Sequence, residues 1–359
     1  INEDIKIKED FISKVKNEYD NLRADHLKRR DEKKYISLED ARRNKPLFKW
    51  KEVNICKPKK IGVTILKNYS LEEIRKYIDW TPFFLTWELK GKYPTIFDDE
   101  KVGTEARKLF DDANKMIDEI ISSSSLTANG VVGLFPANSV EDDIEVYSSD
   151  NRDGVLSVLH TLRNQSEKSI NSENLALADF IAPRHSGIID YIGAFAVTTG
   201  IGIEHLIEKY EKDHDDYNSI LVKAVADRFA EAFAEHLHLK VRKEFWGYDE
   251  YENLSNDELI KEKYKGIRPA PGYPAQPDHT EKNIIFDLLS VEQNTGITLT
   301  ESLAMYPTAS ICGLYFAHPS AKYFNVGKIS KDQIVDYHTR KGMSILEVEK
   351  WLKPNLNYD

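Results

Sequence analysis

The sequence predicts an α+β fold built on a long, mainly antiparallel sheet with flanking helices. Short runs rich in β-branched and aromatic residues predict strands, and longer runs with apolar residues every three to four positions predict helices. The two kinds of segment do not alternate strictly along the chain, as they would in a doubly wound parallel fold. The 359 residues contain no internal repeat and no convincing linker. We therefore expect a single large domain.

The first 60 residues are dense in charge, and positions 21–34 mix both signs within a helical pattern. Because acidic residues interrupt the basic ones, we interpret this stretch as a solvated helix and not as a nucleic-acid-binding patch. Residues 1–60 are thus expected to form a helical, charge-rich N-terminal part, and residues 61–359 the main body. The chain begins at Ile1 without a methionine, and we interpret it as a part of something longer or a processed product.

The main body contains strand-like and helix-like segments in mixed order. Strands are expected at 62–67, 130–135, 143–147, 191–197, 311–316 and 321–326. Helices are expected at 104–121, at 215–245, near 283–292 and twice within 330–352. Ser70 followed three residues later by Glu73 predicts one more helix start. The run 191–197 is small and apolar, which favours a central position in the sheet.

Composition excludes several classes of partner. The net charge of −10 opposes binding to nucleic acid or to an anionic membrane surface. No apolar run has the length of a membrane-spanning helix, and no signal peptide opens the chain. Two cysteines, Cys56 and Cys312, are too few for a disulfide framework, so we expect two free thiols and a cytoplasmic location.

The segment 266–279 is the most informative part of the chain. It holds four prolines and two glycines around Arg268 and Tyr273. Proline fixes φ and removes N–H donors, so the segment can be neither helix nor central strand. We expect a stiff, irregular loop that presents side chains and carbonyls to a ligand. The planar guanidinium of Arg268 predicts a carboxylate or phosphate partner.

The common catalytic motifs are missing from the sequence. It has no G-x-G-x-x-G after a strand, no Walker A loop, no H-E-x-x-H, no C-x-x-C and no G-x-S-x-G. His236 and His238 are two positions apart on an expected helix and so face different sides. We therefore predict no metal site and no catalytic side chain. The remaining polar residues on structured elements suit a small zwitterion: Asp79, Glu231, Arg268, Tyr273 and Tyr323.

Four segments, read together, resemble the C-terminal activation domain of cobalamin-dependent methionine synthase, which binds S-adenosylmethionine. They are 77–84, 133–138, 191–197 and 268–274. The family signature Arg-x-x-x-Gly-Tyr matches Arg268 to Tyr273. The resemblance spans nearly the whole chain and implies a C-shaped domain with a long, twisted sheet and its ligand on the inner surface.

The resemblance also implies roles for individual residues. Arg268 is expected to hold the methionyl carboxylate and Asp79 the amino group, with Glu231 near the methionyl end. Ala270 is expected to contact the nucleoside through its backbone. The other expected ligand contacts are Tyr273, Tyr323 and Phe324. Phe324 stands where the family often has a second tyrosine, and Gln276 where some relatives have cysteine, so neither that hydroxyl nor a thiol is expected here.

The implied role is reactivation of cob(II)alamin to methylcobalamin, with one electron from flavodoxin or a diflavin reductase and a methyl group from S-adenosylmethionine. The cobalamin would be held by another domain, because the Asp-x-His-x-x-Gly motif is absent from this chain. Zinc would belong only to the missing parts of the enzyme, and the isolated chain is not expected to make methionine. Two other hypotheses remain. One is a non-catalytic module that docks the cobalamin domain and a flavodoxin-type donor, and the other is an unrelated metal hydrolase that uses loop histidines.

Overall fold

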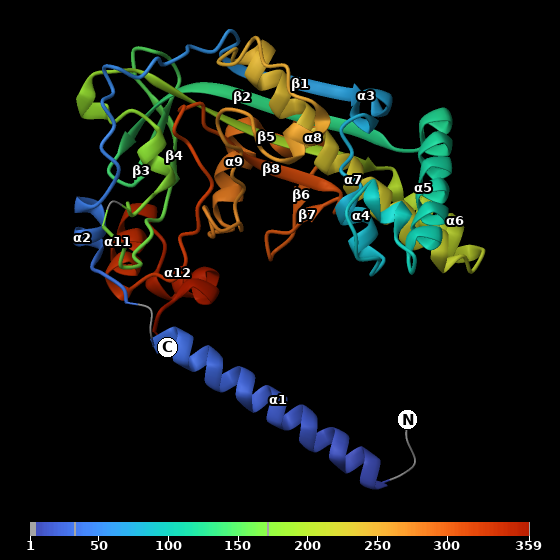
Figure 1. Ribbon diagram of the computed structural model, residues 1–359. Coiled ribbons are helices and arrows are strands. Elements are labelled where there is room, and N and C mark those ends of the chain that lie inside the picture. The colour runs from blue at the N-terminus through green and yellow to red at the C-terminus, as the bar shows by residue number, and fades with distance from the viewer. Residues whose placement is uncertain (1–4, 32–33, 171, 359) are drawn as a thin grey trace.

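The computed structural model describes residues 5–31, 34–170 and 172–358, without the side chains of 5–7 and 24–31. Its N-terminal part contains two helices, α1 (Ile5–Asp31) and α2 (Leu38–Arg43). The side chains described along α1, at 8–23, are nearly all exposed. Most side chains of the solvated helix expected at 21–34 lie outside the described residues. Residues 44–61 are not helical, so the helical character expected for 1–60 ends at α2. Figure 1 shows α1 extending away from the body.

The main body is built on a six-stranded antiparallel sheet, as the sequence predicts. Its strands are β1 (Gly62–Tyr69), β2 (Thr127–Val140), β3 (Asp143–Tyr147), β4 (Val155–His160), β5 (Asp190–Ile201) and β8 (Ser310–Tyr315). The long strand β2 pairs with β5 along one edge, and with β1 and then β3 along the other. β5 lies between β2 and β8, which confirms the central position expected for 191–197. A separate hairpin joins β6 (Thr298–Leu299) to β7 (Met305–Tyr306).

Helices cover both faces of the sheet. The helices that share a core with one face of the sheet are α3 (Leu71–Arg75), α4 (Thr81–Thr86), α5 (Gly103–Ser123), α6 (Ile203–Lys212) and α7 (Asp216–Lys240). The later ones are α8 (Asn256–Ile260), α9 (Glu281–Leu289), α10 (Val291–Thr295), α11 (Lys331–Lys341) and α12 (Ile345–Leu352). The body is arched in Figure 1, with α11 and α12 below one end of the sheet and α4, α5 and α6 below the other.

Period-two alternation along the strands sends neighbouring side chains into separate cores. Phe195 and Val197 of β5 join the core formed with α5 and α7. Ala194 and Ala196 join the core formed with α9 and α10 on the opposite face. Because β5 is buried on both faces, it reads as a continuous apolar run. A third, smaller cluster holds α11 and α12 to the body.

Three expected elements differ from the structure. The segment 321–326 is not a strand, because its backbone groups bond to loops and side chains: Val326 N–H donates to Pro274 O, and Asn164 donates to the carbonyls of Asn325 and Val326. The helix expected near 283–292 is two helices, since Ser290 adopts φ 47° between α9 and α10. The helix expected at 215–245 is α-helical to Lys240 and ends in a π-helical turn, Val241–Phe245.

A buried carboxylate at the start of β5 makes stability depend on pH. Burial raises the pKa of Asp190 to about 6, although Ala182 and Tyr191 N–H groups each donate to it at 2.8 Å. A carboxyl whose pKa is higher in the folded state binds more protons there. Its contribution to the free energy of unfolding therefore falls as pH rises from about 4 to 6. Relative to wild type, Asp190→Asn should gain about 2–3 kcal/mol of unfolding free energy between pH 4 and pH 7. Urea denaturation at both pH values measures this, and a difference that stays constant with pH contradicts it.

Candidate ligand-binding site

A cleft of about 540 Å³ lies where α7, the loop 266–279 and the segment 323–325 meet the sheet. Its walls include Phe195 from β5 and Ile311 from β8. Six of the seven residues expected at the site line it: Glu231, Arg268, Ala270, Tyr273, Tyr323 and Phe324. The fold therefore brings together residues up to 93 positions apart in sequence, from 231 to 324.

The beginning of the loop is anchored to the edge of the sheet. Ile267 and Phe316 exchange two backbone hydrogen bonds of 3.0 Å, and Leu314 N–H donates to Pro269 O at 2.9 Å. Arg268 lies between these two anchor points, so its backbone continues the strand order beyond β8. Its own N–H donates to the hydroxyl of Tyr323 at 3.0 Å. The stiffness expected from the prolines thus rests on pairing with β8 as well.

The middle of the loop folds back on itself. Tyr273 N–H donates to Ala270 O at 3.2 Å, and Gly272 N–H donates to Gln276 O at 2.7 Å. Gln276 is buried, and its amide donates to His160 O at 2.7 Å. Gln276 therefore fixes the loop to β4.

Arg268 is held from behind the cleft by three side chains. Its Nη2 lies 2.6 Å from a carboxylate oxygen of Glu235, and its Nη1 donates to the hydroxyl of Tyr264 at 3.0 Å. Nη1 also lies 3.3 Å from Nδ1 of His238. These contacts leave the Nε–H and one Nη2–H without a partner among the described residues. Burial alone would lower the pKa of Arg268, but Glu235, Tyr264 and Tyr323 together raise it, so the guanidinium stays charged.

His238 is neutral and joins the arginine to an aromatic stack. Burial lowers its pKa well below the ordinary value, and Arg242 and Arg268 add to this. Because a guanidinium only donates, Nδ1 of His238 accepts from Arg268, and Nε2 carries the proton toward Tyr248 at 3.3 Å. The imidazole stacks on Tyr315 at 4.9 Å, and Tyr315 stacks on Phe195 at 4.6 Å.

The mouth of the cleft is lined by exposed polar and aromatic groups. Glu231 is exposed there, and desolvation by the surrounding walls raises the pKa of its carboxyl, with Arg228 opposing the shift. Tyr273 is 63% exposed and Tyr323 39% exposed, so both rings are open to a ligand. With Glu231 and Glu262 against Arg268, the lining carries a net charge of −1.

Asp79 is the one expected site residue that does not line the cleft. It lies between α3 and α4, half-buried, and its carboxylate accepts from Thr81 N–H at 3.0 Å. The segment is nevertheless close to α7, because the ring of Tyr77 contacts His236 at 4.6 Å. The two histidines of α7 face different ways, as expected: His236 toward Tyr69 and Tyr77, and His238 toward Arg268.

The groups that hold Arg268 are not among the residues predicted from the sequence. Glu235 follows Glu231 by four positions, which places both on the same face of α7, and that spacing was the available signal for it. Tyr264 and His238 carry no comparable signal, since only the folded chain brings them to Arg268. Among the described residues, no group of three or more His, Cys, Asp or Glu side chains could hold a metal ion.

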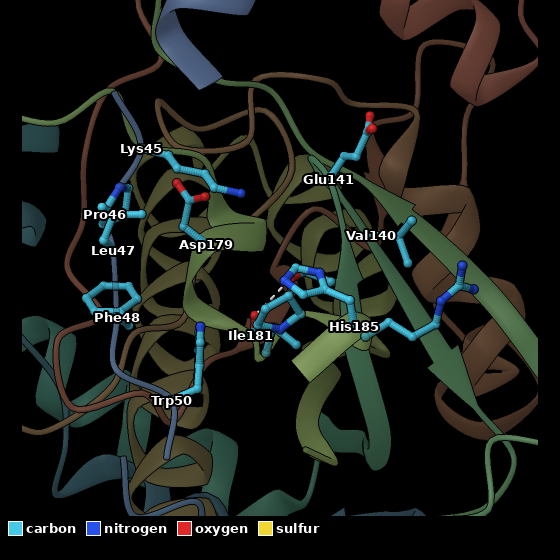
Figure 2. Close-up of a pocket in the computed structure, with 13 residues that line it drawn as sticks. Lys45, Pro46, Leu47, Phe48, Trp50, Val140, Glu141, Asp179, Ile181 and His185 are labelled. Atoms are coloured by element: carbon cyan, nitrogen blue, oxygen red, sulfur yellow. Dashed lines mark hydrogen bonds between the residues drawn. The ribbon is translucent and has the colours of Figure 1, made fainter. Parts of the chain in front are cut away.

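A second cavity, of about 370 Å³, lies apart from the cleft (Figure 2). Residues 45–50 form one wall, and the end of β2 with the segment 181–185 forms the other. None of the seven expected site residues lines it. Its one buried acid, Asp179, is already paired with Arg163 at 2.7 Å.

Gly272 offers a test of the loop's rigidity. It has φ +94°, and a Cβ there would lie 2.2 Å from the ring of His279. Gly272→Ala should therefore distort the loop and lower the unfolding free energy by more than the roughly 1 kcal/mol expected from positive φ alone. Gly342→Ala is the matched control, since it has φ +69° and open space around its Cβ. Equal losses in the two variants, measured by urea denaturation, would show that the contact with His279 is unimportant.

Comparison with known proteins identifies the family. The family model described as vitamin B12 dependent methionine synthase, activation domain, matches residues 70–342. The chain belongs to this family. Among solved structures, the activation domain is similar to the MetH reactivation domain bound to AdoHcy, with 56% sequence identity and a TM-score of 0.89. The match covers 90% of this chain and 99% of that one.

The matched region contains the whole cleft of this activation domain, from Phe195 to Asn325. The α+β fold and the family expected from the four sequence segments are thus confirmed. No helix among the residues described here is long and apolar enough to cross a membrane.

Proposed function

We propose that the cleft binds S-adenosylmethionine and that the chain supports reductive methylation of cobalamin held by another domain. One observation carries the proposal: a charged guanidinium with unused N–H groups lies in a cleft that also offers aromatic faces and carboxylates. The similar structure holds AdoHcy, the product that remains when S-adenosylmethionine loses its methyl group.

The charges of the cleft suit the methyl donor. S-adenosylmethionine carries a sulfonium, an ammonium and a carboxylate, so its net charge of about +1 complements the acidic lining. Arg268 would bind the carboxylate through two parallel hydrogen bonds. Glu231 would face the positive groups, and Asp79 would take the ammonium from the side of α4. The rings of Tyr273 and Tyr323 would contact the nucleoside, together with Phe324 and the backbone of Ala270.

The chain's own contribution to the reaction is binding and orientation. In the overall reaction, one electron and the methyl group of S-adenosylmethionine convert cob(II)alamin on the other domain to methylcobalamin, and S-adenosylhomocysteine is released. With its carboxylate fixed at one end and its nucleoside stacked at the other, the ligand would hold its sulfonium methyl in one orientation. This is catalysis by positioning. No side chain here needs to act as a nucleophile.

The partners follow from this chemistry. We propose that the cobalamin domain of the same enzyme docks at the cleft and that flavodoxin or a diflavin reductase supplies the electron. The isolated chain would bind S-adenosylmethionine without making methionine. We also place it in the cytoplasm, because Cys56 and Cys312 are both unpaired.

Calorimetric titration of the chain with S-adenosylmethionine tests the proposal. We expect saturable binding at one site. An absence of binding, together with capture of a cobalamin domain in size-exclusion chromatography, would instead favour a module whose only task is docking.

A further inference from the structure

Glu235 is a buried acid in direct contact with the arginine of the cleft. Glu235 lies on α7 and is 6% exposed, and one of its carboxylate oxygens lies 2.6 Å from Nη2 of Arg268. The other oxygen is buried and has no hydrogen-bond partner among the described residues. A buried carboxylate with an unused oxygen is costly to retain, and fold stability alone gives no reason for it here.

Glu235 is the only acid paired with Arg268 in the part of the chain that the structure describes. Tyr264 and His238 are neutral, since their pKa values are raised and lowered by burial respectively. The cleft also contains Glu231 and Glu262 at its exposed mouth. Without the buried anchor, the long side chain of Arg268 could turn toward these acids and away from the ligand.

We propose that Glu235 is a positioning residue for recognition of the ligand carboxylate. It holds the guanidinium of Arg268 from behind, so that the Nε–H and the second Nη2–H face the cleft before the ligand arrives. Fixing a long side chain in advance removes an ordering cost from binding. This inference rests on the proposed function, and it adds that affinity for the carboxylate end of S-adenosylmethionine depends on a residue that does not itself line the cleft.

A comparison of two ligands separates positioning from a general structural role. S-adenosylmethionine has the carboxylate, and its decarboxylated analogue lacks it. By calorimetry, Glu235→Ala should bind S-adenosylmethionine about tenfold more weakly than wild type, and the analogue within about twofold of wild type. Glu235→Gln keeps an oxygen that accepts from Arg268, so its affinity for S-adenosylmethionine should lie between those of wild type and Glu235→Ala. In an Arg268→Ala background, the same changes at position 235 should have no further effect.

The control is Glu244→Gln. Glu244 is an exposed acid paired with Lys240, so this variant removes one negative charge near the end of α7 without touching Arg268. If Glu235→Ala fails to fold, the nearly isosteric Glu235→Gln carries the test alone.

Each other outcome overturns the inference. Equal losses for both ligands would show that Glu235 supports the fold only, and tighter binding of S-adenosylmethionine would show that it competes with the ligand for Arg268. Failure of the wild type to bind S-adenosylmethionine would reject the proposed function itself.

Discussion

Arg163→Met should lower the free energy of unfolding by about 3–5 kcal/mol. Arg163 is fully buried and donates to Asp142 and Asp179 at 2.5–2.9 Å, and to Asn174 O at 2.7 Å. Its removal leaves two buried carboxylates without their shared partner. Burial would raise the pKa of Asp142, but Arg163 and Arg42 hold that pKa below its ordinary value.

Arg43→Met is the matched control for this prediction. Arg43 pairs with Glu39 and Asp40, but its side chain is 69% exposed, so the change should cost at most about 1 kcal/mol. Urea denaturation at pH 7 measures both variants. A loss below about 1 kcal/mol for Arg163→Met would contradict the view that Arg163 compensates the burial of these two acids. Because the pKa of Asp142 is depressed, its stabilising effect is present at pH 7 and lost as pH falls through that pKa.

Arg268→Ala should weaken binding of S-adenosylmethionine at least about tenfold. A hydrogen bond to a charged group contributes about 1.5–3 kcal/mol, and about 1.4 kcal/mol corresponds to a factor of ten in affinity. Calorimetric titration measures the change.

The control for Arg268→Ala is Arg75→Ala, which removes a cation paired with exposed Asp118 and should leave affinity within about twofold. Unchanged affinity in Arg268→Ala would reject the carboxylate assignment. It would also remove the basis for a positioning role of Glu235.

Local patterns predict most of the fold because each rests on a short-range physical cause. The Ser70 side chain accepts from Glu73 N–H at 3.3 Å, as the helix-start pattern requires. The strand expected at 311–316 is confirmed by β8, which pairs with β5. The segment 321–326 has similar apolar content, yet its partners are the loop carbonyl of Pro274 and the amide of Asn164. Those partners are distant in sequence, so no local pattern reveals them.

The candidate site likewise contains some residues that the sequence predicts and others that it does not. Arg268 and Tyr273 are conspicuous in a proline-rich loop, and the family resemblance points to Glu231, Ala270, Tyr323 and Phe324, which line the same cleft. Glu235 and His238 lie on the buried side of α7 and gain their meaning only when Arg268 is folded against them. Sequence patterns therefore reveal residues that would contact a ligand, but they do not readily reveal the residues that hold those ligand contacts in place.

A crystal structure of the chain grown with S-adenosylmethionine tests the central claim most directly. The account predicts density for the ligand in the cleft of Arg268, with its carboxylate within hydrogen-bond distance of the guanidinium and its nucleoside against Tyr273 and Tyr323. Ligand density in the second cavity (Figure 2), or in the cleft with its carboxylate turned away from Arg268, would contradict it.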